Sequence, residues 1–570
     1  MKKYTDSEQL AGKKIQRIRL QPIQIDEQLT QKQKTALNKV QMFTREEEED
    51  FLSFPSTFDE QTQPFPVIID EQTKPLLKAV VSGEQGAQGY IALISNLMKN
   101  SGVYALGSMA SPLISLILAP FLTRNLSQTD YGAFAVLSTV ITLLAAITQI
   151  GISTAFFRAY NHDYELERDR LHVLSTSVIL MTVVSIPVSL VLVIIAPWVA
   201  AKMFGNPSFT DALRLGAAII LLQNLAAPGI AWLRSEKRAV ASSLLAVANP
   251  LVTLVTTLIL MGLLHMGLTG AFLAITAGYA IVIICVLPVM IAKAGFYLDI
   301  EILKNLLTFG GPIIFTSIAV WILQVSDRGL LSYYTSLAQT GMYSVAYSLG
   351  GVLAPIIIGP FGLAWPPIMY MIAKRDDAAQ IFQLVFRWFS FVLFFAAFGL
   401  SVLATLMLYL LFPSSYHSAS SLIPFITGGL MFYGLYNFVI LGAYIRRKTS
   451  MTAILTIVAA LGNLGLNIIL IPHYGALGAA ISTLAAYMLL AIIAYFINQR
   501  IYPIKFEIGL ATLGLLIGVA LYLGCNFLLP MPATPVGFGI SLVVVLFYGG
   551  GLFALGQFAG RNHKKKYRAV

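Results

Sequence analysis

From residue 101 to residue 559 the chain is a succession of apolar runs, each about 20 residues long, joined by short polar connections. A helix needs about 20 apolar residues to cross the hydrocarbon core of a bilayer. The composition agrees, because 57% of the residues are hydrophobic and only 11% are charged. Soluble domains carry about 25% charged residues. The sequence therefore predicts an all-α polytopic membrane protein.

Fourteen runs qualify as transmembrane helices by this length criterion. They lie at 101–122, 132–155, 173–199, 212–232, 241–263, 269–292, 309–331, 342–366, 388–412, 420–443, 451–472, 475–497, 508–529 and 536–559. "HMGLTG" separates the predicted spans 241–263 and 269–292, and "HYGALG" separates 451–472 and 475–497. These are the shortest connections, so the division of each stretch into two helices depends on its turn residues.

The basic residues test this count through the excess of Lys and Arg in cytoplasmic loops. With the N-terminus inside, the inner connections and the C-terminal tail carry twenty-one Lys and Arg, and the outer side carries three. Losing one span would invert every later loop, so we expect fourteen helices in an N-in/C-in arrangement. The net charge of +11 then reflects topology and contact with anionic membrane lipids, and we expect no nucleic-acid binding.

Two pairs of short motifs indicate an internal repeat. "HMGLTGAF" from His265 and "HYGALGAA" from His473 share the pattern H-x-G-x-x-G-A at an offset of 208. "LSQTDYGAFAV" from Leu126 and "LAQTGMYSVAY" from Leu337 match at an offset of 211. Both copies start on the inner side, which makes them parallel repeats, an arrangement found in alternating-access transporters.

The repeat predicts two parallel six-helix lobes around a central cavity. The N-lobe would span 100–300 and the C-lobe 301–500, and 501–570 would add two extra helices and a basic cytoplasmic tail. Residues 1–99 hold 27 of the 65 charged side chains. They show no sustained apolar period and no signal-peptide core, so we expect a largely disordered cytoplasmic extension.

Motifs of enzymes are missing from the sequence. We find no G-x-x-x-x-G-K-[ST], H-E-x-x-H, C-x-x-C or G-x-S-x-G pattern, and each of these marks a specific chemistry. Asp327 is the one acid within the predicted spans, whereas a proton pump that uses an acid relay would show more. We therefore expect no catalytic residues, no metal site and no cofactor, and a carrier rather than an enzyme.

Three stretches carry a resemblance to a known family. "NSGVYALGSMASPLISLILAPFLTRNLSQTDYGAFAVLSTV" (100–140) resembles the first two helices of the polysaccharide-type, Wzx-like flippases of the MOP superfamily. "LQVSDRGLLSYYTSLAQTGMYSVAYSLG" (323–350) resembles their seventh-to-eighth helix junction, and "LGNLGLNIILIPHYGALGAAISTLAAY" (461–487) their eleventh and twelfth helices. The resemblance covers about residues 95–500, and the extension before it departs from the family pattern.

The resemblance implies a function. Such flippases move an undecaprenyl-diphosphate-linked oligosaccharide repeat unit from the inner to the outer leaflet of the bacterial plasma membrane, for O-antigen, capsule or exopolysaccharide synthesis. Coupling to H+, to Na+ or to the membrane potential stays open. So do two other hypotheses, a MATE-like cation-coupled drug antiporter and a non-transporting scaffold. Residues 1–99 are either a docking segment for a polymerase or synthesis partner or a tolerated tail.

An anionic lipid head requires cations along its path, and Arg binds phosphate in bidentate geometry. We expect the substrate path among Arg124, Arg158, Arg214, Asp327, Arg328, Gln149, Gln324 and Asn224, with further polar candidates at Asn249, Asn437, Asn463 and Asn467. Snorkelling at the interface and bonding between helices are the competing interpretations. Asp327 and Arg328 are adjacent, about four residues before the outer end of the seventh predicted span, and need not pair with each other.

Overall fold

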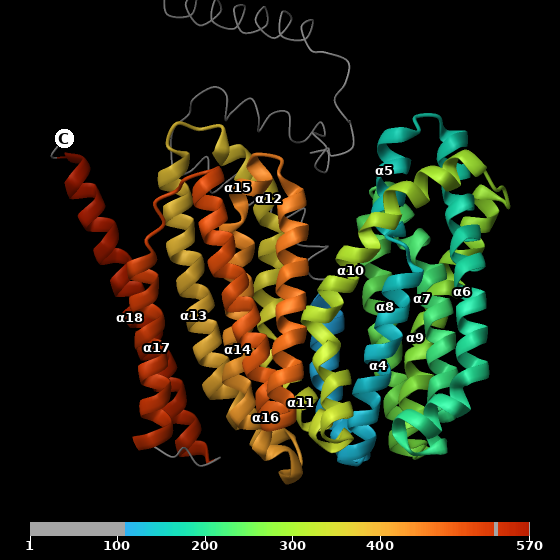
Figure 1. The fold of residues 1–570 in the computed structure, drawn as a ribbon, viewed down its shortest axis with the longest axis horizontal. Coiled ribbons are helices and arrows are strands. Elements are labelled where there is room, and N and C mark those ends of the chain that lie inside the picture. The colour runs from blue at the N-terminus through green and yellow to red at the C-terminus, as the bar shows by residue number, and fades with distance from the viewer. Residues whose placement is uncertain (1–108, 529–533, 569–570) are drawn as a thin grey trace, which may run out of the picture. The chain divides into compact units, whose positions relative to one another are not determined.

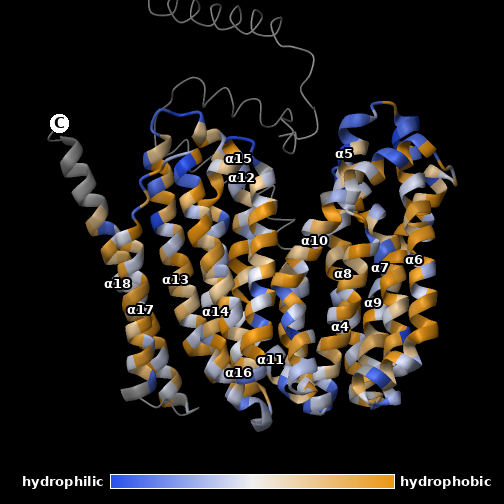
Figure 2. Cartoon of the chain, viewed as in Figure 1, coloured by the Kyte–Doolittle hydropathy of each residue, from blue (hydrophilic) through white to orange (hydrophobic). Residues whose placement is uncertain are grey.

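The computed structural model describes residues 109–528 and 534–568. Every regular element in these two ranges is a helix, and twelve of the helices are long and apolar enough to cross a membrane. Figure 2 shows hydrophobic residues along the helix shafts and hydrophilic residues concentrated near the helix ends. The predicted all-α polytopic membrane fold is confirmed.

The helices follow one another with short connections. After a helix at 109–125 come α4 (Gln128–Thr148), α5 (Ile152–Arg158), α6 (Glu167–Phe204), α7 (Thr210–Ser235), α8 (Ala239–Thr257), α9 (Gly267–Ala294), α10 (Ile300–Tyr334), α11 (Leu337–Gly350), α12 (Gly359–Ala373), α13 (Ala378–Leu411), α14 (Ile423–Val439), α15 (Leu441–Ile445), α16 (Thr449–Ile501), α17 (Ile508–Leu528) and α18 (Pro535–Arg568). The predicted spans 132–155 and 342–366 are each interrupted, the first between α4 and α5 and the second between α11 and α12.

One helix contains two predicted spans. α16 is continuous by its hydrogen bonds, but Gly475 inside it has φ 54° and ψ −132°, which is not helical. The predicted division between 451–472 and 475–497 falls at this kink. The first predicted span, 101–122, begins outside the described residues. The count of fourteen and the N-in/C-in orientation stay predictions.

The turns of the two halves share an unusual backbone geometry. Gly267 and Gly475, at the same position of the H-x-G-x-x-G-A motifs, have φ of 56° and 54°. Lys237 and Arg447 have φ of 56° and 55°, in the left-handed region that few side chains adopt. The two pairs lie 208 and 210 residues apart, close to the offsets of the sequence motifs.

The seventh predicted span is longer in the structure than the sequence indicated. α10 begins at Ile300 instead of residue 309 and ends at Tyr334 instead of residue 331. Its start is fixed by Asp299, whose Oδ1 accepts hydrogen bonds from the amides of Glu301 (2.9 Å) and Ile302 (3.1 Å), an N-cap. The apolar criterion missed this first part because it carries charged residues outside the membrane-length run.

Figure 1 shows α4–α9 as one group of helices and α11–α16 as another, with α10 running obliquely between them. α10 contacts α4, α5 and α6 of the first group and α11 and α16 of the second. α17 and α18 pack on α13. Arg387 of α13, which we counted from the sequence as a loop cation, is 5% exposed. Its guanidinium donates to both carboxylate oxygens of Glu507, just before α17, and to the carbonyl of Gly556 in α18 (3.1 Å).

Candidate functional site

The ion pair of α10 lies inside the protein. Asp327 is 3% exposed, and 14% of the Arg328 side chain is exposed. Nη1 of Arg328 lies 3.4 Å from Oδ1 of Asp327, and the amide of Arg328 donates to the same oxygen at 2.8 Å. The two adjacent charges therefore do pair, which the sequence argument did not require. With α10 ending at Tyr334, Asp327 lies seven residues from the helix end, roughly 10 Å at 1.5 Å per residue.

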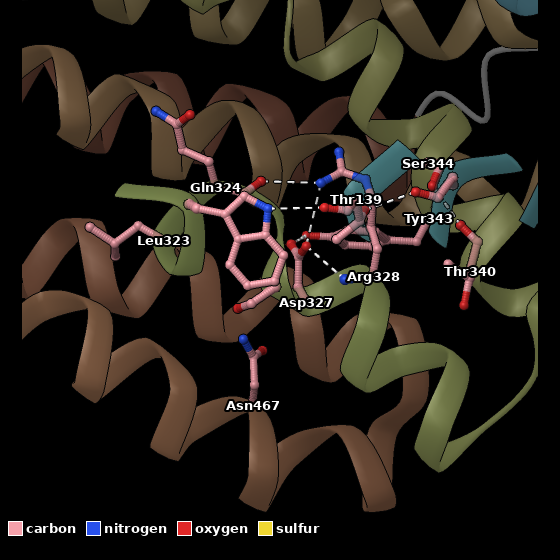
Figure 3. Close-up of polar contacts among 12 residues, drawn as sticks. Thr139, Leu323, Gln324, Asp327, Arg328, Thr340, Tyr343, Ser344 and Asn467 are labelled. Atoms are coloured by element: carbon pink, nitrogen blue, oxygen red, sulfur yellow. Dashed lines mark hydrogen bonds and ion pairs between the residues drawn. The ribbon is translucent and has the colours of Figure 1, made fainter. Parts of the chain in front are cut away.

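Tyrosines of α11 complete the surroundings of the pair. The hydroxyl of Tyr343 donates to Oδ2 of Asp327. The Arg328 guanidinium lies 4.5 Å from the ring centroid of Tyr347 and 5.9 Å from that of Tyr343. At such distances the negative face of an aromatic ring attracts a cation. Figure 3 shows Tyr343 and Arg328 converging on the Asp327 carboxylate.

Arg328 keeps donors for a ligand. Its Nη1 also donates to the carbonyl of Gln324 at 3.1 Å. Within the described part of the chain, Nε and Nη2 of Arg328 make no hydrogen bond. A guanidinium has five N–H donors in a fork that matches phosphate and carboxylate oxygens. A partly exposed Arg328 with free donors is thus able to bind an anion.

A cavity of about 220 Å³ begins one helical turn before Arg328 on α10. It lies between α10, α14, α15 and α16, and none of the described residues that line it carries a formal charge. Polar and aromatic members of the lining include Gln324, Tyr433, Tyr436, Asn437, Thr456 and Tyr487. The hydroxyl of Tyr487 points to the carbonyl of Leu323 at 3.5 Å. The cavity and the ion pair are therefore neighbouring parts of one site along α10.

The site touches the first helix group through α4. Nε1 of Trp321 in α10 donates to the carbonyl of Thr139 at 3.1 Å and to the hydroxyl of Thr142 at 3.3 Å. Figure 3 shows Thr139 of α4 beside Arg328, Gln324 and Asp327 of α10. α10 consequently joins α4 to the residues that surround the ion pair.

The sequence candidates divide into two sets. Asp327, Arg328, Gln324 and Asn437 come together at the site. Asn463 and Asn467 are buried in α16, where Nδ2 of Asn467 donates to Oδ1 of Asn463 at 3.1 Å. Figure 3 draws Asn467 together with the residues of the ion pair.

The remaining candidates lie elsewhere. Arg124 is exposed at the end of the helix at 109–125, before α4. Arg214 is exposed and pairs with Asp211 at 3.2 Å. Arg158 pairs with Asp163 at 3.4 Å and lies 4.6 Å from the centroid of Phe309.

Three amide side chains in the first helix group also lie away from the ion pair. Asn224 is fully buried in α7, where its Nδ2 donates to the hydroxyls of Thr148 (2.7 Å) and Ser185 (2.8 Å). This is the geometry of an interhelical polar bond. Gln149 caps the C-terminal end of α4, and Asn249 is half-buried in α8.

The tyrosines were missed by the sequence argument. Tyr343 and Tyr347 are four residues apart on α11, so they lie on one helix face. Tyr433, Tyr436 and Tyr487 come from α14 and α16, far along the chain. A search of the spans for charged and amide side chains passes over them. The i, i+4 spacing on α11 was the signal available.

Comparisons with known proteins agree with this architecture. Residues 97–373 match the family described as "Polysaccharide biosynthesis protein". An uncharacterized membrane protein of Methanocaldococcus jannaschii is 24% identical over 421 residues, which cover 69% of this chain and 82% of that protein.

Solved structures share the fold. A lipid II flippase MurJ in an inward closed conformation has a TM-score of 0.63 at 17% identity, covering 83% of this chain and 99% of its own. An outward-facing multidrug resistance MATE family transporter of the MOP superfamily has a TM-score of 0.51 at 17% identity, covering 70% of this chain and 94% of its own. At such identities the likeness concerns the fold alone.

The described part of the chain thus has the composition of a multi-pass membrane protein and the fold that the MurJ and MATE structures share. The family match covers residues 97–373, just under half of the chain, and it agrees with the resemblance to polysaccharide-type flippases that the sequence shows.

Proposed function

We propose that the chain moves an undecaprenyl-diphosphate-linked oligosaccharide from the inner to the outer leaflet of the bacterial plasma membrane by alternating access, without changing it chemically. The observation that carries the proposal is Arg328, a partly exposed cation with free donors, next to an uncharged cavity of tyrosine, threonine and amide side chains. This pairing suits a molecule with an anionic diphosphate and a neutral hydroxylated glycan. The match to polysaccharide biosynthesis proteins supports the same cargo.

A MATE-like drug and cation antiporter is less consistent with these side chains. A cationic substrate is favoured by acidic groups, yet no acid lines the cavity among the residues that the structure describes. Asp327 is engaged by Arg328 and Tyr343. A cation in the cavity would also meet the repulsion of Arg328.

The membrane potential is our proposed driving force. With the inside negative, outward movement of an anion is favoured by about 2.3 kcal/mol per charge per 100 mV. An imposed inside-negative potential is expected to accelerate outward transfer. Transfer that requires a proton or sodium gradient instead would identify an antiporter.

A deletion strain tests the function in cells. Loss of surface polysaccharide with accumulation of lipid-linked units inside is the expected phenotype, restored by the intact gene and not by the Arg328→Gln variant. Drug hypersensitivity with normal surface polysaccharide would contradict the proposal. Residues 1–99 lie outside the described residues, and we propose them as a docking segment for a polymerase or synthesis protein. Rescue by this segment alone would identify a scaffold instead.

A further inference from the structure

We infer that the cavity between α10, α14, α15 and α16 is a subsite for one sugar ring of the transported molecule. The inference rests on the proposed function, because it says which part of a lipid-linked oligosaccharide binds there. It assigns the diphosphate to Arg328 and the first sugar to the neighbouring cavity.

The size of the cavity favours a single ring. Its volume is about 220 Å³, whereas pockets for drug-sized ligands measure roughly 300–1,000 Å³. A longer glycan would extend beyond the cavity. A cavity of this size therefore has room for one sugar ring. Because the cavity adjoins Arg328, that ring is the one attached to the diphosphate.

Aromatic faces line the cavity on two helices. The rings of Tyr433 and Tyr487 have centroids 5.1 Å apart and are inclined by 47°. Tyr436 lies 6.1 Å from Tyr433 with its ring nearly parallel. A tyrosine offers an apolar ring face and a polar tip. The C–H face of a pyranose can pack on such rings while its hydroxyls point to their rims.

Polar groups accompany these rings at positions suited to sugar hydroxyls. Nδ2 of Asn437 donates to the carbonyl of Tyr433 at 2.9 Å. The Oδ1 of Asn437 is not used in that bond and can accept from a sugar hydroxyl. Thr456 lines the same cavity from α16, and Gln324 lines it from α10 with an exposed side chain. A few polar groups in an otherwise aromatic and apolar lining are typical of sites that orient a small ligand.

The charges decide between a sugar and a cation, because a tyrosine-lined site also attracts quaternary ammonium groups. In the described ranges, 109–528 and 534–568, no residue that lines the cavity is acidic. Arg328 lies four residues beyond Gln324 and donates to its carbonyl, so the nearest strong charge is positive, about 6 Å along the helix. A neutral ring attached to an anion fits this arrangement, and a cation does not.

Binding of two probe lipids to the purified full-length protein tests the subsite. The probes are undecaprenyl diphosphate and the same lipid carrying one glucose or one N-acetylglucosamine. We expect the intact protein to bind a glycosylated probe at least about tenfold more tightly, a difference of ~1.4 kcal/mol. Tyr433→Ala should abolish this advantage and leave the affinity for undecaprenyl diphosphate unchanged.

Matched variants separate the subsite from general damage. Tyr433→Phe keeps the ring face and should keep most of the sugar advantage. Tyr333→Ala removes an 80% exposed ring of the same helix as Arg328 and should change nothing. If Tyr433→Ala does not fold, Asn437→Leu carries the same test, because it removes an amide that lines the cavity.

The outcomes distinguish the subsite from the proposed function. If both probes bind, and Arg328→Gln weakens both while Tyr433→Ala and Asn437→Leu leave the sugar advantage intact, the subsite is wrong and the function stands. Equal loss of affinity for both probes in Tyr433→Ala also overturns the subsite. If the intact protein binds neither probe, the proposed function fails and the subsite fails with it.

Discussion

At the scale of single residues, the pair of Asp327 and Arg328 explains how two charges persist within an apolar span. Each costs several kcal/mol in hydrocarbon, on the order of 3 on insertion scales. Asp327 receives the guanidinium and amide of Arg328 and the hydroxyl of Tyr343. The Arg328 guanidinium lies over the ring face of Tyr347. Removing either charge leaves the other without its partner, so the pair acts as a unit.

The first prediction concerns these two charges. Arg328→Ala and Asp327→Ala should each reduce export of lipid-linked oligosaccharide at least about tenfold. Arg328→Ala removes the group that binds the anion, and Asp327→Ala leaves Arg328 and Tyr343 without the carboxylate that holds them in place. Membrane insertion should be unchanged, as judged by the amount of protein in the membrane fraction. Wild-type export by both variants would leave the pair with a structural role alone.

A second prediction separates the two tyrosines of α11. Tyr343→Phe removes the hydroxyl that donates to Asp327, and a hydrogen bond to a charged group contributes about 1.5–3 kcal/mol. Tyr347→Phe keeps the ring under Arg328, and within the described residues the Tyr347 hydroxyl makes no hydrogen bond. Thermal unfolding of the purified variants should show a lower Tm for Tyr343→Phe only. Equal shifts in both would argue against the carboxylate contact.

At the scale of helices, the crossing of α4 and α11 depends on glycine. A Cβ at Gly132 would overlap the carbonyl oxygen of Leu337, and one at Gly341 would lie 2.6 Å from the carbonyl oxygen of Gln128. Near this crossing Gln128 donates to the carbonyl of Ser415, and Tyr131 meets Tyr416 edge to face at 6.1 Å. Small residues permit such close approach of membrane helices.

The third prediction is that Gly132→Ala separates α4 from α11. Overpacking of this kind costs about 1–3 kcal/mol. Cysteines placed at Gln128 and Ser415, with Cys285 and Cys525 replaced by alanine, should be joined efficiently by a short bifunctional reagent. Adding Gly132→Ala should reduce this cross-linking. Gly462→Ala, at a position where an added Cβ meets nothing within 4 Å, is the control, and an equal effect there would refute the argument.

A fourth prediction concerns the attachment of the last two helices. Arg387 is buried and bonded to Glu507 and to the carbonyl of Gly556. Breaking a buried pair by removing one partner costs about 3–5 kcal/mol. Arg387→Ala should therefore lower the Tm strongly, whereas Arg375→Ala should lower it little, because Arg375 and Asp377 form an ion pair at 2.7 Å whose side chains are 35% and 43% exposed. Similar Tm values for both variants would contradict this reasoning.

At the scale of the whole molecule, the site is asymmetric with respect to the sequence repeat. Lys237 and Arg447 share their left-handed backbone at equivalent turns. At the offset of 211, Asp327 and Arg328 correspond to Leu116 and Ile117, and Ile117 is 62% exposed. The charge pair thus belongs to one half only, where α10 links the two helix groups.

The sequence predicted much of this architecture and part of the site. Apolar length located most spans, and the cost of charge in a membrane singled out Asp327 and Arg328. Apolar length alone missed the start of α10 at Ile300, because the helix begins before the apolar run. The N-cap at Asp299 marks this start, and the length criterion does not consider caps. The sequence argument missed Tyr343, Tyr433 and Tyr487, because their neighbours come from distant helices and no linear pattern joins them.

The most direct test of the account is transfer of undecaprenyl-diphosphate-linked sugar across vesicles that contain the purified protein. The probe begins in the leaflet corresponding to the cytoplasmic side, and its arrival in the other leaflet is measured with a lectin or a glycosidase that cannot cross the membrane. We predict transfer by the intact protein well above that of empty vesicles, and transfer near the empty-vesicle rate for Arg328→Gln. Equal rates for the intact protein and for empty vesicles would contradict the account.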